Sequence, residues 1–187
     1  MASGEGGVNF LKAVMGGRKD QRELVDSAHA SIMAQALQPA FFGDGRVEDT
    51  FAGRFEVAAL HSALALRRLR ELGPTGQAFA QEVFDELFSG FDDALREIGT
   101  GDLRVGKKIR RIGEAFYGRA RAYDAALAPD AAETALADAI ARNIDLKDEV
   151  ASSFAQYARK VAAALDAQGE ESLLSAQFDW PDATLSL

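Results

Sequence analysis

The segment GTGDLRVGKK, residues 99–108, contains the residue types of a phosphate-binding loop. In a P-loop of pattern G-x-x-x-x-G-K-[ST], backbone N–H groups and the lysine hold phosphates, and the final hydroxyl binds Mg²⁺. Gly101, Gly106 and Lys107 have this spacing, but Lys108 stands where the hydroxyl is needed. The preceding FDDALREIG has the pattern of a helix, whereas a P-loop follows a buried strand. We therefore interpret the segment as a corner between two helices.

Four residues fit the requirements of such a corner. Gly99 is placed to end the first helix, because glycine adopts the left-handed conformation that closes many helices. Asp102 is placed to cap the second helix, whose first N–H groups have no intrahelical acceptor. Gly101 gives the turn conformational freedom. Gly106 has no side chain, so a partner can approach the backbone closely there.

The helix that starts at this corner is basic, although the chain carries a net charge of −8. Residues 100–121 hold seven basic and two acidic residues, a local charge of +5, which leaves −13 on the rest of the chain. Cations at a helix start oppose the helix dipole, so we expect this face to meet a partner; a solvated basic face is the alternative. The acidic balance opposes non-specific binding to DNA. The candidate partner-binding residues are Arg104, Lys107, Lys108, Arg111 and Arg119.

The remaining chemistry-bearing residues predict no catalytic or metal site. The chain has no cysteine, which excludes disulfides, thiolate catalysis and thiolate-held metals. Its two histidines, His29 and His61, belong to no H-E-x-x-H or Glu-x-x-His pattern. No serine or threonine is marked as a nucleophile, and carboxylates spaced by four residues are typical of surface pairs. We therefore predict a non-enzyme without a metal or cofactor.

Apolar periodicity predicts the elements that position these residues. The i, i+3, i+4 spacing predicts helices at 19–37, 50–72, 75–98, 102–127, 130–144 and 147–167. Proline or glycine follows several of them, as in Gln38-Pro39 and Gly73-Pro74. No segment alternates with period two long enough to predict a strand. The expected fold is all-α, a single compact bundle of about six helices with short connectors.

The helix at 50–72 is apolar on two sides, which predicts a central place in the bundle, and Thr50 or Asp49 can cap its start. His61 lies on one of these apolar stripes. We interpret it as a core histidine with satisfied hydrogen bonds. The alternative is a haem- or small-molecule-binding protein that uses His61 or His29 as a ligand.

Aromatic residues cluster on two of the predicted helices. On 75–98 they recur at helical spacing, which is typical of a core face and also of a face that covers an apolar partner. The candidate client-contact aromatics are Phe84, Phe88, Phe91, Phe116, Tyr117 and Tyr123.

The two ends of the chain differ from its middle. Residues 1–18 contain five glycines and are predicted to form a flexible arm, packed loosely on the domain or in weak contact with a membrane. The helical domain is expected at 19–182, with Phe178 and Trp180 packed on its body, and a tail at 183–187. No apolar run reaches the roughly 18 residues of a membrane span, and no signal-peptide pattern is present, so we expect a cytoplasmic protein.

Several ordered motifs resemble the ubiquinol-cytochrome c chaperone family, found in alphaproteobacteria and mitochondria. They are GRFEVAALHSALALRRLR at 53–70, AQEVFDELFSGFDDALREIGTGDLRVGKKIRR at 80–111 and AFYGRARAYDAAL at 115–127. IMAQALQPAFF at 32–42 and SLLSAQFDW at 172–180 also fit, so the resemblance covers about 20–182.

This resemblance implies a helical, non-catalytic assembly chaperone of respiratory complex III, the ubiquinol-cytochrome c reductase. Its client would be newly made cytochrome b, and mitochondrial relatives act with a small partner protein and the ribosome. A peripheral position at the inner membrane would fit such a client. The residues themselves leave open a ribosome- or RNA-contacting helical module that uses the basic face at 104–121.

Overall fold

The computed structural model describes the backbone of residues 5–43, 45–97, 102–144 and 146–185. Side chains are described for 20–43, 45–93, 96, 110–144 and 146–185. Within these ranges the chain forms helices and one isolated bridge between Phe42 and Val47, which confirms the all-α prediction. The helices are α1 (Glu5–Ala36), η1 (Pro39–Phe41), α2 (Phe51–Glu71), α3 (Gly73–Glu97), α4 (Asp102–Ala126), α5 (Ala135–Ile144), α6 (Asp148–Ala167) and α7 (Glu170–Leu174).

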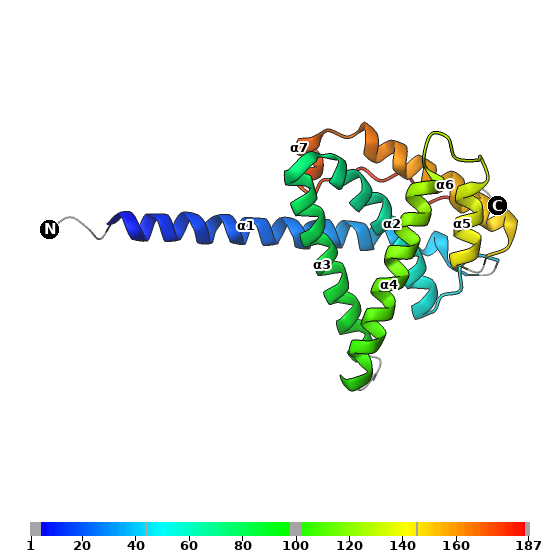
Figure 1. The fold of residues 1–187 in the computed structure, drawn as a ribbon, viewed down its shortest axis with the longest axis horizontal. Helices are drawn as coiled ribbons and strands as arrows, with labels where there is room; N and C mark the ends of the chain where they lie inside the picture. Colours follow the sequence, from blue (N-terminus) through cyan, green and yellow to red (C-terminus); the bar gives the residue numbers. More distant parts are fainter. Residues whose placement is uncertain (1–4, 44, 98–101, 145, 186–187) are drawn as a thin grey trace.

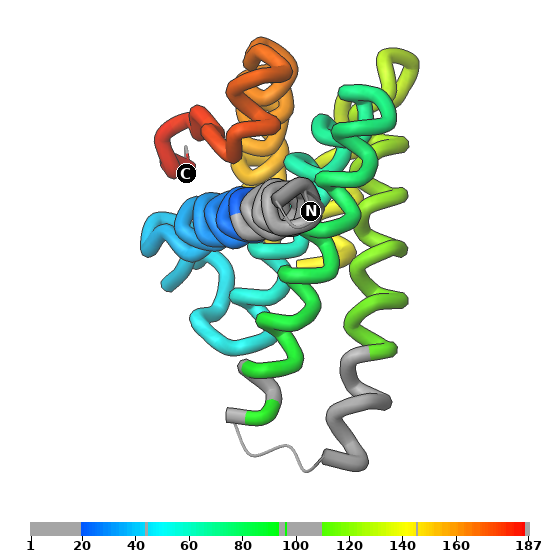
Figure 2. The backbone as a smooth tube through the Cα atoms, turned by 90° about the vertical axis from the view of Figure 1, so that its left-hand side faces the viewer, coloured from blue at the N-terminus to red at the C-terminus, as the bar shows by residue number. Residues whose placement is uncertain are grey.

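Helix α2 is the centre of the bundle (Figures 1 and 2). It packs against α1, α3, α4, α5 and α6, and every residue from 57 to 66 is buried. A helix that is apolar around its circumference can be accommodated only inside a protein. The predicted central position of this helix is therefore confirmed.

Local residue chemistry sets both ends of α2. The Thr50 hydroxyl accepts a hydrogen bond from the Gly53 N–H at 3.1 Å, which confirms the predicted cap. At the other end Gly73 has φ +75°, a conformation that favours glycine. Pro74 then lies in the first turn of α3, where its missing N–H costs no intrahelical hydrogen bond. Helix α3 thus starts at Gly73 rather than at the predicted residue 75.

Other boundaries also differ from the sequence prediction. The predicted start of the first helix at 19 lies inside α1, which begins at Glu5. The fifth helix begins at Ala135 instead of 130, because residues 128–134 form turns with hydrogen bonds from Ala131 N–H to the Ala128 carbonyl and from Ala135 N–H to the Ala132 carbonyl. Helix α7 forms at Glu170–Leu174, beyond the last helix that the apolar periodicity predicted.

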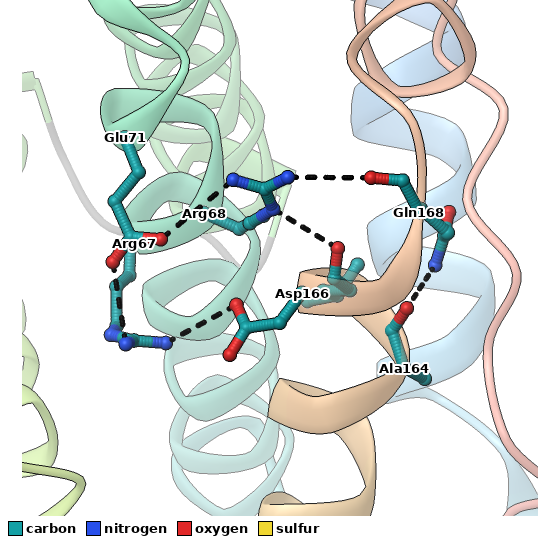
Figure 3. A network of polar contacts seen from close by, with 7 residues as sticks. Arg67, Arg68, Glu71, Ala164, Asp166 and Gln168 are labelled. Carbon is teal, nitrogen blue, oxygen red and sulfur yellow. Dashed lines mark hydrogen bonds and ion pairs between the residues drawn. The ribbon is translucent and has the colours of Figure 1, made fainter. Parts of the chain in front are cut away.

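Arginines of α2 hold the C-terminal end of α6 (Figure 3). The Arg68 guanidinium donates to the backbone carbonyls of Leu165 at 3.1 Å and Gln168 at 3.3 Å. Arg67 lies 3.7 Å from the Asp166 carboxylate. The last carbonyls of a helix lack intrahelical donors and carry the negative end of its dipole. Arg68 therefore stabilises the end of a neighbouring helix, besides lying near the end of its own.

The C-terminal segment packs on the body, as predicted from its aromatic residues. The Trp180 Nε1–H donates to the Ser31 hydroxyl of α1 at 2.9 Å. Phe178 stacks on Trp180 with ring centroids 5.5 Å apart, and Leu185 is buried. This segment covers the side of the bundle where α1 meets α6.

Candidate partner-binding surfaces

The predicted basic face belongs to α4, which pairs with α3 (Figure 2). Helix α4 begins at Asp102, where the sequence placed a helix start, and Gly106 lies in its backbone. Gly99 and Gly101 lie outside the described residues, as do the side chains of Arg104, Lys107 and Lys108.

Among the described part of this face, Arg111 is exposed, together with its neighbours Arg110 and Arg121. These three arginines lie on one helix and are available to a partner. They are the described portion of the basic surface that the sequence predicts.

Arg119 has a different position, because its guanidinium is turned toward α2. Both its Nε and a terminal nitrogen donate to the Glu56 carboxylate, in a bidentate pair. The side chains of Arg119 and Glu56 are only 17% and 14% exposed, and the guanidinium carbon lies 5.6 Å from the Phe55 ring centroid. Arg119 thus joins α4 to α2 inside the protein, and a partner would have to compete with Glu56 for it.

The candidate aromatics separate into core residues and a surface patch. Phe91, Phe116 and Tyr123 are buried, and burial raises the pKa of the Tyr123 hydroxyl. Phe84 and Phe88 are half-buried and pack on the core, while Tyr117 is 50% exposed.

Phe84 connects the surface aromatics of α3 and α4. Its ring centroid lies 4.4 Å from that of Phe88 and 5.3 Å from that of Tyr117. Phe84, Phe88 and Tyr117 form the α3–α4 aromatic patch, the part of the predicted set that a partner can reach.

His61 is a fully buried histidine with both ring nitrogens bonded. Its Nδ1 lies 2.8 Å from the Val57 carbonyl, which can only accept, so Nδ1 carries the proton. Its Nε2 lies 2.9 Å from the Tyr157 hydroxyl, which donates to it and accepts from the Gln35 amide at 2.8 Å. Burial lowers the pKa of His61 to about 4. The core interpretation is confirmed, and no nitrogen of His61 is left to ligate haem.

A groove that sequence reasoning missed lies between α1, α2 and α3. Its volume is about 280 Å³ and its lining is mostly apolar. Leu37 at its edge is 37% exposed, and the charge of Arg54 is balanced by a bidentate contact with Asp49. We call this the apolar groove; it is lined by His29, Met33, Leu37, Phe51, Arg54, Phe55, Leu87, Gly90 and Phe91.

A second depression lies between α1 and α3, with a volume of about 440 Å³. Four of its lining residues are acidic and one, Arg22, is basic. The Glu82 carboxylate accepts a hydrogen bond from the Gln21 amide at 3.0 Å, which joins the two helices. We call this the acidic groove; it is lined by Gln21, Arg22, Val25, Asp26, Glu82, Asp85 and Glu86.

These grooves bring together residues that are about sixty positions apart in the chain. The periodic pattern showed that α1 and α3 are amphipathic, but it did not show which of their faces meet. The acidic residues at 82, 85 and 86 lie close together in the sequence, and this cluster is the signal that could have indicated the acidic groove.

We searched the described part of the chain for metal-binding clusters and membrane-spanning helices. There, no group of three or more His, Asp or Glu side chains is placed to hold a metal ion. The described helices also include none with the length and hydropathy needed to cross a membrane.

The chain is similar to known proteins over most of its length. The family described as Ubiquinol-cytochrome C chaperone matches residues 43–180. The crystal structure of the Cbp3 homolog from Brucella abortus matches with a TM-score of 0.82 and 35% sequence identity, over 93% of this chain and 97% of that chain. Among curated proteins, no match was found.

Proposed function

Because the chain belongs to the ubiquinol-cytochrome C chaperone family, we propose that it is a non-catalytic assembly factor that binds newly made cytochrome b while complex III is built. The family match across residues 43–180 carries this proposal, since it spans α2 to α6 and reaches Trp180. A chaperone role in complex III assembly follows from the family. What we propose beyond the family's role is that the client is cytochrome b.

The charge distribution supports a client of this kind. Membrane proteins place an excess of Lys and Arg in their cytoplasmic loops. Outside residues 100–121 this chain carries a charge of −13, which favours contact with such loops through electrostatic complementarity. We propose that the protein works on the cytoplasmic side, peripheral to the inner membrane.

Deletion of the gene tests the proposed function. Membranes of the deletion strain are expected to lose the cytochrome b signal in reduced-minus-oxidised spectra, together with quinol–cytochrome c reductase activity. A plasmid copy of the gene should restore both. Normal cytochrome spectra with full activity in the deletion strain would contradict the proposal. Cytochrome b, and any small partner protein, should co-purify with a tagged copy from growing cells.

A ribosome contact is the second candidate, favoured by the exposed Arg110, Arg111 and Arg121 on α4. Contacts between arginine side chains and the phosphates of ribosomal RNA weaken as the salt concentration rises. Co-sedimentation with ribosomes should therefore decrease at higher salt. The variant Lys107→Glu with Lys108→Glu should abolish it. The matched control is Lys147→Glu with Lys160→Glu, which reverses two exposed charges elsewhere. Equal co-sedimentation of both variants would exclude this candidate.

A further inference from the structure

The acidic groove and the apolar groove are both lined by residues of α1 and α3, two helices that cross and pack against each other (Figure 1). On α1, Asp26 lines the acidic groove, and His29 and Met33 follow one and two turns later in the apolar groove. On α3, Glu82, Glu86 and Gly90 succeed each other at i, i+4 and i+8. Residues at these spacings share one helix face.

Within the apolar groove, His29 faces Gly90. A Cβ atom at Gly90 would lie 3.5 Å from His29 Nε2, an ordinary van der Waals distance, so the imidazole lies beside the α3 backbone at this position. Along a helix, Asp26 and His29 are only about 4.5 Å apart. The two grooves are therefore neighbours along α1, and we call the pair the α1–α3 seam, which is acidic at one end and apolar at the other.

The chemistry of the two ends restricts the partner. Four carboxylates and one guanidinium line the acidic end, which repels anionic lipid and nucleic acid and attracts Lys or Arg. At the apolar end the Arg54 charge is balanced by Asp49, so Met33, Leu37 and Phe91 favour hydrocarbon. The apolar end is a groove of about 280 Å³ with the exposed Leu37 in its lining. It suits side chains that project from a longer partner.

From this juxtaposition we infer that the α1–α3 seam binds a polypeptide segment in which basic residues adjoin an apolar run. The basic side chains lie in the acidic groove and the apolar side chains in the apolar groove. This sequence pattern occurs at the cytoplasmic end of transmembrane helices. The inference rests on the proposed function, because it specifies which part of an apolar client the chaperone holds.

Synthetic peptides test the seam directly. The probe is a fluorescein-labelled peptide with about two helical turns of leucine and alanine followed by Lys-Arg-Lys. Two control peptides replace either the basic residues with Glu or the leucines with Ser. In fluorescence anisotropy, the full chain should bind the probe roughly tenfold more tightly than either control. Equal affinity for the probe and the leucine-free peptide would show attraction of charge alone and would overturn the inference.

Variants at each end of the seam locate the binding site. Asp26→Asn with Glu86→Gln should weaken probe binding roughly fivefold, since each charge pair at the surface contributes modestly. Met33→Ser with Leu37→Ser, at the apolar end, should weaken it to a similar extent. The control is Asp130→Asn with Glu133→Gln, which removes two exposed carboxylates before α5 and should leave binding unchanged. Circular dichroism melts verify that each variant is folded.

The results separate the inference from the proposed function. If the seam variants bind the probe like the wild type, the inference is wrong even where the gene deletion lowers cytochrome b. If the seam variants lose the probe but the gene deletion leaves cytochrome b normal, the seam binds such segments and the proposed client is wrong. When both hold, the seam variants should also fail to restore the cytochrome b spectrum in the deletion strain, whereas the control variant restores it.

Discussion

The Nε2 atom of His61 on α2 lies 2.9 Å from the hydroxyl oxygen of Tyr157 on α6, inside the core. The Tyr157 hydroxyl in turn accepts from the Gln35 amide of α1, which also donates to the Pro181 carbonyl at 2.9 Å. Three helices and the C-terminal segment are therefore joined by one chain of hydrogen bonds, buried except for the partly buried bond to Pro181. Every donor in that chain has an acceptor, which is the condition under which buried polar groups do not destabilise a core.

The burial of His61 makes stability depend on pH. Unfolded His61 has its ordinary pKa of 6.5, while burial lowers the folded pKa to about 4. As pH falls from 6.5 to 4 the unfolded state takes up a proton that the folded state does not, so the free energy of unfolding decreases. The loss amounts to about 2 to 3 kcal/mol at pH 4.5. Urea unfolding at pH 7.5 and 4.5 measures it.

The control for this pH effect is His61→Gln, which does not titrate. It should be less stable than the wild type at pH 7.5 but should lose less stability between pH 7.5 and 4.5. The carboxylates of the chain contribute equally to both proteins and cancel in the comparison. An identical pH dependence in the two proteins would show that His61 is not held neutral in the folded state.

The ion pair between Glu56 and Arg119 is expected to stabilise the α2–α4 contact. Either Glu56→Gln or Arg119→Met leaves one charge mostly buried without its partner, at a cost of about 3 kcal/mol. The exposed pair of Asp49 and Arg54, with side chains 50% and 55% exposed, is the control, and Arg54→Ala should cost less than about 1 kcal/mol. Urea unfolding of each variant provides the comparison.

The double variant of Glu56 and Arg119 distinguishes an ion pair from two independent residues. Because the second substitution removes the charge that the first leaves unpaired, the double variant should be clearly more stable than the sum of the two single effects implies. Strictly additive losses would mean that the two side chains do not interact, and Arg119 would then be free to bind a partner.

Arg68 is expected to matter more than its neighbour Arg70. Arg68 is 17% exposed and donates to two carbonyls at the end of α6, so Arg68→Ala should cost about 2 kcal/mol. Arg68→Lys should recover less than half of this, because one ammonium group cannot reproduce the planar fork of the guanidinium. Arg70, 44% exposed and 3.7 Å from Asp124, should tolerate alanine within about 0.5 kcal/mol. Equal losses at 68 and 70 would rule out the capping role.

Features that depend on local pattern could be predicted from the sequence. The central place of α2 follows from its two apolar stripes, and the Thr50 cap follows from a hydroxyl just before a periodic run. His61 was identified as a core residue because it lies on one of those stripes. In each case the residues that determine the burial or the cap lie within a few turns of the same helix.

Features that depend on contacts between distant segments could not be predicted. Arg119 was assigned to the basic face, and its inward position depends on Glu56, which is 63 residues away. The α1–α3 seam depends on which faces of two helices meet, and periodicity alone does not determine this. The start of α5 depends on hydrogen bonds of the turns at 128–135, where the sequence pattern predicted a helix from residue 130.

Trp180 is the single tryptophan of the chain, and its position makes it a reporter of C-terminal docking. Its indole N–H donates to Ser31 and its ring lies 6.1 Å from that of His61, so native emission should be blue-shifted relative to the unfolded chain. Because the segment also bonds to Gln35 through Pro181, it should detach only with the rest of the fold, and urea transitions followed by fluorescence and by far-ultraviolet circular dichroism should coincide. Ser31→Ala removes the indole acceptor and should cost about 1 kcal/mol, with Ser152→Ala, at an exposed position of α6, as its control. A fluorescence transition at clearly lower urea than the loss of helix would show that the C-terminal segment is bound independently of the core.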